Sequence, residues 1–314
     1  MECWLEDSRG TRLTLPPQTQ WRFSYTSGTP ADSFEVECLW GDQADERLTG
    51  GVYFLAREGS ERVFTGLVDE CESRWDESGS RLSIRGRGMA ARLLDNEARG
   101  ADYQVATWAD ILRDHVTPYG ITALGGENLP HVSGFSIATG SSEWSVVYQF
   151  ARYYGGVEPR FDRLGRLVVE DASAGRHLVL DQTCPVTSLL LRDKRYGVLS
   201  QVLLRNPNDQ GEQTVVNETF AAQGGMRRQV LTMPRKSGYE AMRYRGEYQI
   251  ACSAEELRRL ELRAAAPWLA FPGDRVELRL ERPRLTGLWR VRESVCGCGA
   301  QGNYTELDLC PQAQ

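Results

Sequence analysis

The sequence predicts a mixed α+β protein that is mainly β, with two barrel-like β domains flanking a helical, α+β middle domain. Strand-type patterns fill the first 88 residues and return after residue 186, and the clearest helical patterns fall between them. The order of strands and helices also lacks the regular alternation of a parallel α/β sheet. The predicted domains are therefore residues 1–88, 89–185 and 186–314.

The first domain is predicted from short segments rich in Val, Phe, Tyr and Trp, several of which alternate apolar with polar residues. These segments are residues 19–27, 33–40, 51–57, 62–75 and 81–86. The last two are joined by residues 76–80, where Gly79 can adopt the positive φ of a hairpin turn. Short strands at hairpin spacing indicate a barrel or a sandwich.

Three helices are predicted in the middle domain, at residues 89–98, 107–116 and 141–156. Thr107 and Asp110 have the spacing of a capping box at the start of the second helix. The third helix places its apolar residues at three- and four-residue steps, which is typical of one buried face. A hairpin with its turn at Arg163–Gly165 is expected to follow.

The third domain, residues 186–314, returns to strands and contains one predicted helix. The expected strands are residues 186–193, 197–206, 213–220, 227–233, 274–282, 288–299 and 303–310. The helix is expected at about 253–266, because Ser253 and Glu256 have capping-box spacing and Pro267 would end it. No internal repeat of 20–50 residues is visible in the sequence.

The composition and charge of the chain argue against some classes of binding partner. The chain has 314 residues, a formal net charge of −6 and eight cysteines. No basic stripe with interleaved aromatic residues is present, so no specific nucleic acid is expected as a partner. No run of 18 apolar residues is present, so we expect no membrane insertion. The N-terminus lacks an apolar signal region, so we expect the chain to fold in a cytoplasm.

The pattern G-x-G-x-x-A, formed by Gly86, Gly88 and Ala91, is the nearest match to a dinucleotide-binding motif. The preceding strand alternates with charged residues, whereas a parallel central strand is nearly all apolar. The segment also ends a run of antiparallel-type strands, and Asp110 lies at a helix start. A strand-to-helix domain junction is the preferred interpretation, so no cofactor-binding residue and no cofactor are predicted.

Metal-ligand patterns are weak. His115, His131 and His177 are widely separated, and Cys296, Cys298 and Cys310 do not match the usual zinc spacings. Three thiolates on paired strands remain the alternative interpretation, but reduced, partly buried cysteines are preferred in a cytosolic chain of this length. No metal site is predicted.

No catalytic residue is predicted either, and we expect the chain not to be an enzyme. There is no G-x-S-x-G elbow and no phosphate-binding loop that ends in Gly-Lys-Ser/Thr. Five carboxylates around the loop at 76–80 are interpreted as a solvated acidic face, although an acid pair formed by tertiary folding stays open. They are Asp69, Glu70, Glu72, Asp76 and Glu77.

An aromatic group in the third predicted helix has two interpretations. Trp144, Tyr148, Tyr153 and Tyr154 could form a ligand platform, or they could pack a core and a domain interface. Their helical spacing favours packing.

Several segments resemble a known family. DSFEVECLW (32–40), the stretch from Val63 to Ala98 with its RGRG junction, and TWADILRDHVTPYGI (107–121) are similar to phage tail hub proteins. Residues 141–171 resemble the family's helix, Gly-Gly and hairpin, and residues 270–295 resemble its closing strands. The family includes the late control protein D-like proteins, the Mu-like tail proteins and their counterparts in phage-like bacteriocins.

The resemblance implies a structural baseplate hub of a contractile phage tail, prophage or other contractile injection system. It implies a homotrimer in which each subunit contributes two β-barrel-like domains, the first a tube domain, to a ring. Its implied partners are the tail tube protein, the central spike protein and a tape-measure protein. The implied location is the virion tail baseplate, after assembly in the host cytoplasm. The alternatives are a tail-associated peptidoglycan hydrolase and another structural tail protein, such as a distal tail or spike component.

Overall fold

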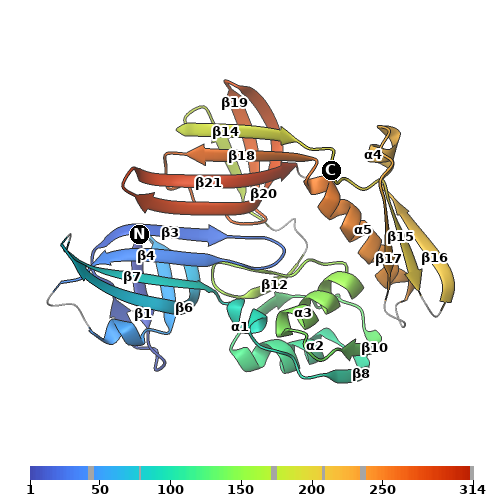
Figure 1. The fold of residues 1–314 in the computed structure, drawn as a ribbon, viewed down its shortest axis with the longest axis horizontal. Coiled ribbons are helices and arrows are strands. Elements are labelled where there is room, and N and C mark those ends of the chain that lie inside the picture. The colour runs from blue at the N-terminus through green and yellow to red at the C-terminus, as the bar shows by residue number, and fades with distance from the viewer. Residues whose placement is uncertain (42–45, 78, 171–174, 207–208, 234–237, 312–314) are drawn as a thin grey trace.

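The computed structural model describes residues 1–41, 46–77, 79–170, 175–206, 209–233 and 238–311. Within these residues the protein is mainly β, and one 13-stranded, largely antiparallel sheet crosses it from the N-terminal to the C-terminal strands (Figure 1). The mainly β, mixed fold class predicted from the sequence is confirmed. No helix in the described part of the chain is long and apolar enough to cross a membrane.

The N-terminal unit, which we define as residues 2–88, contains seven strands and one short helix. They are β1 (Glu2–Glu6), β2 (Arg12–Thr14), β3 (Gln18–Tyr25), β4 (Ser33–Leu39), the 3-10 helix η1 (Glu46–Gly50), β5 (Tyr53–Glu58), β6 (Glu61–Asp76) and β7 (Gly79–Gly88). Alternate side chains of these strands meet in an aromatic core, where Phe34 stacks on Phe54 at 3.9 Å and Phe23 lies against Phe64. The five expected strands are present, and β1 and β2 are additional.

The middle segment folds as short helices over two small sheets. Its elements are α1 (Ala91–Leu94), β8 (Ala101–Ala106), α2 (Trp108–Ile111), the π-helix η2 (Leu112–Val116), the 3-10 helix η3 (Thr117–Tyr119), β9 (Ala123–Gly125), β10 (Val132–Ile137), α3 (Glu143–Tyr148), the π-helix η4 (Gln149–Tyr154), β11 (Arg160–Phe161) and β12 (Leu167–Val169). The predicted capping box is confirmed, since Thr107 and Asp110 bond reciprocally. The helix expected at 89–98 is much shorter, covering only Ala91–Leu94.

The remaining strands form a C-terminal unit and a small lobe. The C-terminal unit consists of β13 (His177–Asp181), β14 (Val186–Asp193), β18 (Arg258–Ala264), β19 (Arg275–Glu281), β20 (Arg284–Gly299) and β21 (Gly302–Pro311). The lobe, between β14 and β18, consists of β15 (Gln201–Asn206), β16 (Asp209–Val216), α4 (Glu218–Ala222), β17 (Arg228–Thr232) and α5 (Tyr239–Glu255).

The helix expected at 253–266 is wrong. Ser253 lies near the end of α5, where its hydroxyl donates to the carbonyl of Ile250. The following residues form β18, which lies between β14 and β21. Leu260, Leu262 and Ala264 are buried at every second position, so a period of two, and not a helical period, governs this segment.

The two sheet units repeat the same strand order. Counted from one edge, the N-terminal unit runs β3-β4-β7-β6-β5 and the C-terminal unit runs β14-β18-β21-β20-β19. Corresponding strands have matching lengths of 8 residues for β3 and β14, 7 for β4 and β18, 10 for β7 and β21, and 16 for β6 and β20. The chain is therefore an architectural duplication that the sequence does not reveal.

Register irregularities repeat as well. The β6–β7 pairing shifts between Val68 and Glu70, and the β20–β21 pairing shifts at the corresponding place, between Val291 and Glu293. The β3–β4 pairing shifts between Gln18 and Gln20, and the β14–β18 pairing between Val186 and Ser188. Because a bulge bends its strand, the matching bulges place bends at corresponding points of the two units.

Neither unit closes into a ring of paired strands within the described residues. The N-terminal pairing ends at β2 on one side, and on the other side β3 pairs with β20 of the C-terminal unit. A closed barrel is therefore not part of the observed backbone pairing.

Candidate interaction site at the junction of the units

The two units are joined by one antiparallel seam. Five residue pairs connect β20 to β3, from Ser294 opposite Tyr25 to Cys298 opposite Trp21. Of the core-facing residues of this seam, Phe23, Tyr25, Ser294 and Cys296 are almost fully buried. Because each unit contributes paired backbone to the other, the seam makes the two sheets continuous (Figure 1).

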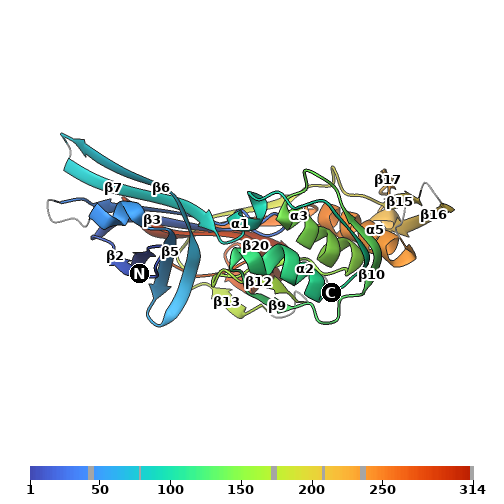
Figure 2. The ribbon, with the colours of Figure 1, turned by 90° about the horizontal axis from the view of Figure 1, so that it is seen from below.

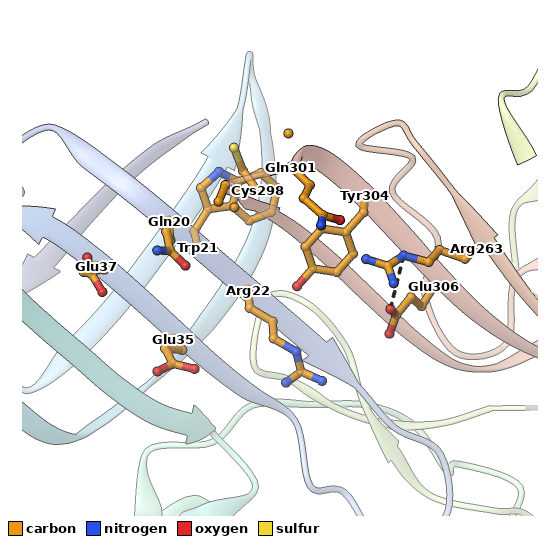
Figure 3. Close-up of a pocket in the computed structure, with 13 residues that line it drawn as sticks. Gln20, Trp21, Arg22, Glu35, Glu37, Arg263, Cys298, Gln301, Tyr304 and Glu306 are labelled. Carbon is orange, nitrogen blue, oxygen red and sulfur yellow. Dashed lines mark ion pairs between the residues drawn. The ribbon is translucent and has the colours of Figure 1, made fainter. Parts of the chain in front are cut away.

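The exposed face of the seam is a polar groove of about 480 Å³ (Figure 3). Arg22, Glu35 and Glu37 line it from the N-terminal unit, and Arg263 and Glu306 form an ion pair at 3.6 Å on the other side. Small-molecule sites are mostly apolar and enclosed, whereas this groove mixes exposed charges of both signs. The groove therefore suits a solvated or protein-contacting face better than a cofactor site.

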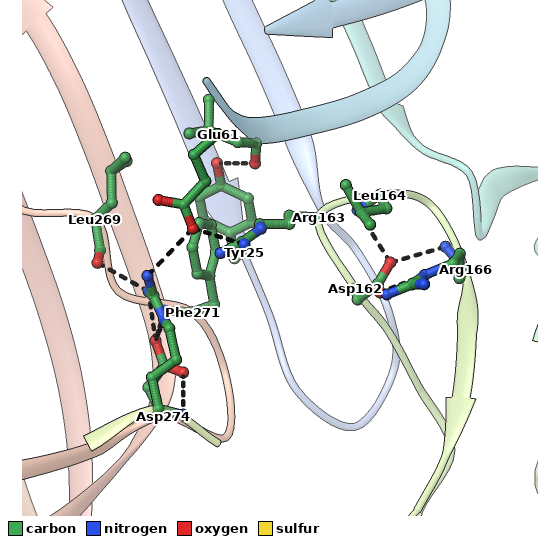
Figure 4. Close-up of polar contacts among 11 residues, drawn as sticks. Tyr25, Glu61, Asp162, Arg163, Leu164, Arg166, Leu269, Phe271 and Asp274 are labelled. Carbon is green, nitrogen blue, oxygen red and sulfur yellow. Dashed lines mark hydrogen bonds and ion pairs between the residues drawn. The ribbon is translucent and has the colours of Figure 1, made fainter. Parts of the chain in front are cut away.

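A second contact region joins the N-terminal unit, the middle segment and the C-terminal unit (Figure 4). The guanidinium groups of Arg163 and Arg176 lie 5.0 and 4.8 Å from the centre of the Phe271 ring, and the ring of Tyr25 meets it edge-on at 4.9 Å. Arg163 also pairs with Glu61 at 2.6 Å. Each of these residues contacts a residue of another unit, so the cluster fixes the relative orientation of the three units.

Arg176 holds the C-terminal side of this cluster. Its Nε and Nη2 donate to one oxygen of Asp274 at 3.2 and 2.7 Å, and Nη2 also donates to the carbonyl of Leu269. The other Asp274 oxygen accepts the backbone N–H of Arg176. Charge-assisted bonds of this kind are directional as well as strong, which favours a fixed junction over a mobile hinge.

Asp32 lines the same region, beside Tyr25 and Arg160. Its Oδ1 accepts the backbone N–H of Thr26 at 2.8 Å and the Thr26 hydroxyl at 3.3 Å. Burial raises the pKa of Asp32 to about 7, because the charged form loses solvation there. The carboxyl therefore titrates near neutral pH at the junction of the units.

The glycines of the dinucleotide-like pattern lie in a strand. Gly86 and Gly88 belong to β7, and a Cβ at Gly86 would lie 1.9 Å from the carbonyl oxygen of Leu67. Gly88 donates its backbone N–H to the carbonyl of Asp32 at 2.7 Å. These glycines allow close strand packing, and this local geometry forms no phosphate-binding turn.

The cysteines considered as metal ligands are not gathered. Cys296 lies opposite Thr305, whereas Cys310 lies opposite Arg290, further along the same strand pair. Burial raises the pKa of the Cys296 thiol to about 11, which favours the neutral thiol over the metal-binding thiolate. No group of three or more metal-ligand side chains occurs in the part of the chain that the structure describes.

Most of the acidic residues considered as a catalytic pair lie within strand β6 and not in the loop after it. Asp69 pairs with Arg87 at 2.7 Å, and Glu70 lies 3.6 Å from Arg85. Both carboxylates are exposed and form ion pairs with the neighbouring strand, as expected of a solvated face.

The aromatic group of the third predicted helix packs both a core and an interface. Trp144 is buried in the middle core, and Tyr148 donates its hydroxyl to that of Tyr248 in α5 at 2.6 Å. Arg245 of α5 lies over the ring of Tyr153 at 4.2 Å. Tyr154 packs against Phe135 of the middle core. These contacts agree with the interpretation that the aromatic group packs a core and an interface.

A buried polar network escaped the sequence analysis. His115 Nδ1 lies 2.6 Å from a carboxylate oxygen of Glu143, and Tyr119 donates to the other oxygen at 2.8 Å. His115 Nε2 lies 3.1 Å from the hydroxyl of Tyr103. These side chains satisfy one another's hydrogen-bonding groups inside the middle core. From the sequence, only the positions of His115 and Glu143 in two predicted helices could have suggested their contact.

No family model matches the sequence, and no curated protein sequence matches it. Among solved structures, the tail protein of Neisseria meningitidis MC58 aligns over 99% of this chain and 96% of its own, with TM-score 0.80 and 18% identity. The 43 kDa tail protein of prophage MuSo2 from Shewanella oneidensis aligns over 99% and 98%, with TM-score 0.81 and 18% identity.

The chain has the fold of these phage tail proteins. A component of the E. coli type VI secretion system, described as structurally similar to the T4 tail proteins gp27 and gp5, has the same fold over 95% of this chain and 74% of its own. Its TM-score is 0.61 at 13% identity. The tail-protein fold thus covers nearly the whole chain, including the lobe and the middle segment.

Proposed function

We propose that the chain is a structural baseplate hub of a contractile phage tail or a phage-like particle, and that it joins the tail tube to the central spike. The observation that carries this proposal is the duplication of the sheet unit within one continuous sheet. A chain with two similar units can present six similar units as a homotrimer, which reconciles a six-fold tube with a three-fold spike. Its tail-protein fold and its resemblance to the hub family support this role.

The proposal includes three domains, residues 1–88, 89–185 and 186–314, of which the first is a β-barrel-like tube domain and the last a second β-barrel-like domain. Three large buried clusters support the division, and they centre on Phe23 and its neighbours, on Phe150, and on Leu262. A fourth, smaller cluster around Leu204 belongs to the lobe. The proposed partners are the tube, spike and tape-measure proteins, and the proposed place is the virion baseplate after assembly in the host cytoplasm.

The proposed role is not enzymatic. The junction residues bind one another, and the groove at the seam is open and charged. A zymogram of the purified chain on peptidoglycan should show no cleared band; a cleared band would favour the tail-associated hydrolase.

Electron microscopy of assembled particles tests the hub role directly. We expect three copies at the junction of tube and spike. Six copies along the tube, or absence from that junction, would overturn the proposal.

A further inference from the structure

Within the described residues, two sheet edges have no partner strand, although the corresponding edges of the other unit are paired. In the observed seam, β3 of the N-terminal unit pairs with residues 294–298 of β20, beyond the residues of β20 that pair with β19. The counterpart of β3 is β14, and within the described residues no strand pairs with its edge opposite β18. The counterpart of this part of β20 is residues 69–75 of β6, beyond the residues of β6 that pair with β5.

We propose that β14 of one copy pairs antiparallel with residues 71–75 of β6 in a second copy of this chain, reproducing the internal seam between subunits. This inference rests on the proposed hub function and specifies its subunit contact. Each copy offers one edge of each kind, so the contact is head-to-tail, and the proposed homotrimer is a closed ring of three such contacts. Adding a strand to an open edge satisfies the backbone groups of both partners.

The matching bulges and strand ends fix the register. Cys71 corresponds to Ser294, because each lies one position beyond the first residue after its bulge, and Asp193 corresponds to Tyr25 as the last residue of its strand. Transferring the observed pairs places Cys71 opposite Asp193. The next pairs are Glu72 with Arg192, Ser73 with Leu191, Arg74 with Leu190 and Trp75 with Leu189.

The exposed fractions agree with a missing partner strand. Phe23 and Cys296, a directly opposed pair in the internal seam, are 0% and 2% exposed. The corresponding Leu191 and Ser73 are only partly buried in the single chain. Trp75 is 66% exposed, at the end of the β6–β7 hairpin that projects beyond the rest of the N-terminal unit (Figure 2).

The side chains in the transferred register are complementary. Trp75 would cover Leu189 on the core face, as Trp21 lies opposite Cys298 in the internal seam with the large and small partners exchanged. On the polar face, the carboxylate of Glu72 would meet the guanidinium of Arg192. A slip by one residue would remove this ion pair and turn Trp75 toward the polar face, because side chains alternate along a strand.

A single cysteine substitution in the full-length chain tests the register. In Asp193→Cys, the new thiol should lie opposite the native Cys71 of the neighbouring copy, and mild oxidation should give intermolecular cross-links mapped to these two positions by mass spectrometry. Directly opposed residues in antiparallel strands are close enough for a disulfide after small shifts. Adding Cys71→Ser should abolish the cross-link.

Arg192→Cys is the matched control, because its side chain lies one position away and points to the opposite face of the sheet. It should give no cross-link to Cys71. A charge exchange gives an independent readout: E72R or R192E alone should weaken self-association in sedimentation, and the two together should restore it.

The outcomes separate the contact from the function. Oligomers without the Cys71 cross-link, or a cross-link in Arg192→Cys instead, would overturn the register but leave the hub role. A chain that stays monomeric and uncross-linked at high concentration would overturn the edge contact as well. The expected cross-link in a protein absent from the tube–spike junction would overturn only the hub role.

Discussion

Removing the indole of Trp144 should destabilise the middle core strongly. Trp144 is 5% exposed, and its ring lies 5.9 Å from the rings of both Tyr148 and Phe161. A buried tryptophan removes about 150–250 Å² from water, worth roughly 4–6 kcal/mol at about 25 cal/mol per Å². Measured Trp→Ala substitutions in cores cost about 3–5 kcal/mol, so we expect a loss in that range for Trp144→Ala.

Differential scanning calorimetry of the full-length chain measures this effect. For a cooperative unit of about 100 residues, the size of the proposed domain 89–185, a loss of about 3–5 kcal/mol lowers the melting temperature by roughly 12–40 °C. Trp75→Ala is the matched control, because Trp75 is 66% exposed and its removal should change the stability of the single chain by only about 0.5 kcal/mol. Equal melting of Trp144→Ala and the original protein would refute the packing of this ring.

Four further predictions follow from the described contacts. Gly86→Ala should cost about 1–3 kcal/mol by overpacking, because its Cβ would meet the Leu67 carbonyl, whereas Gly41→Ala has open space and should be neutral in the same urea titration. In the folded chain the pKa of Asp32 is raised to about 7 from an ordinary value of 3.8, so its contribution to stability is full below pH 4 and is lost as the pH rises to 7. In thermal melts across this pH range, Asp32→Asn should remove that loss. The same dependence of melting temperature on pH in the variant and the original protein would contradict the prediction. Thiol titration of the denatured, unreduced protein should count close to all eight cysteines, and stoichiometric zinc would contradict the prediction that the chain holds no metal. Calorimetry with NAD, FAD and ATP should give no binding, since Gly86 and Gly88 lie within β7; a micromolar dissociation constant would contradict this.

Local patterns predicted much of the secondary structure, because local chemistry determines those elements. Thr107 and Asp110 cap the same helix start that their spacing predicts, and the hairpin after the third helix turns at Arg163–Gly165 as expected. Helix 253–266 failed because Ser253 and Glu256 mimic a helix start while the alternating Leu260 and Leu262 belong to a central strand. In that segment the pairing with β14 and β21 overrides the local signal.

The junction itself could not be predicted from sequence, since its members are far apart along the chain. Phe271, Tyr25 and Arg163 come from three different units and meet only in the folded chain, and none of these residue types is unusual alone. The His115–Glu143 pair is hidden for the same reason.

The duplication escapes sequence comparison for a physical reason. A sheet unit requires alternation, strand length, turns and bulges, but different side chains can meet those requirements. Gly79 and Gly302 begin corresponding strands with positive φ, whereas Phe23 and Leu191 occupy corresponding core-facing positions with different side chains. The lobe inserted between β14 and β18 also breaks the spacing of the second unit. What persists is the register, and it distinguishes the edge of β20 that β3 already occupies from the edge of β6 where we propose that a second copy pairs.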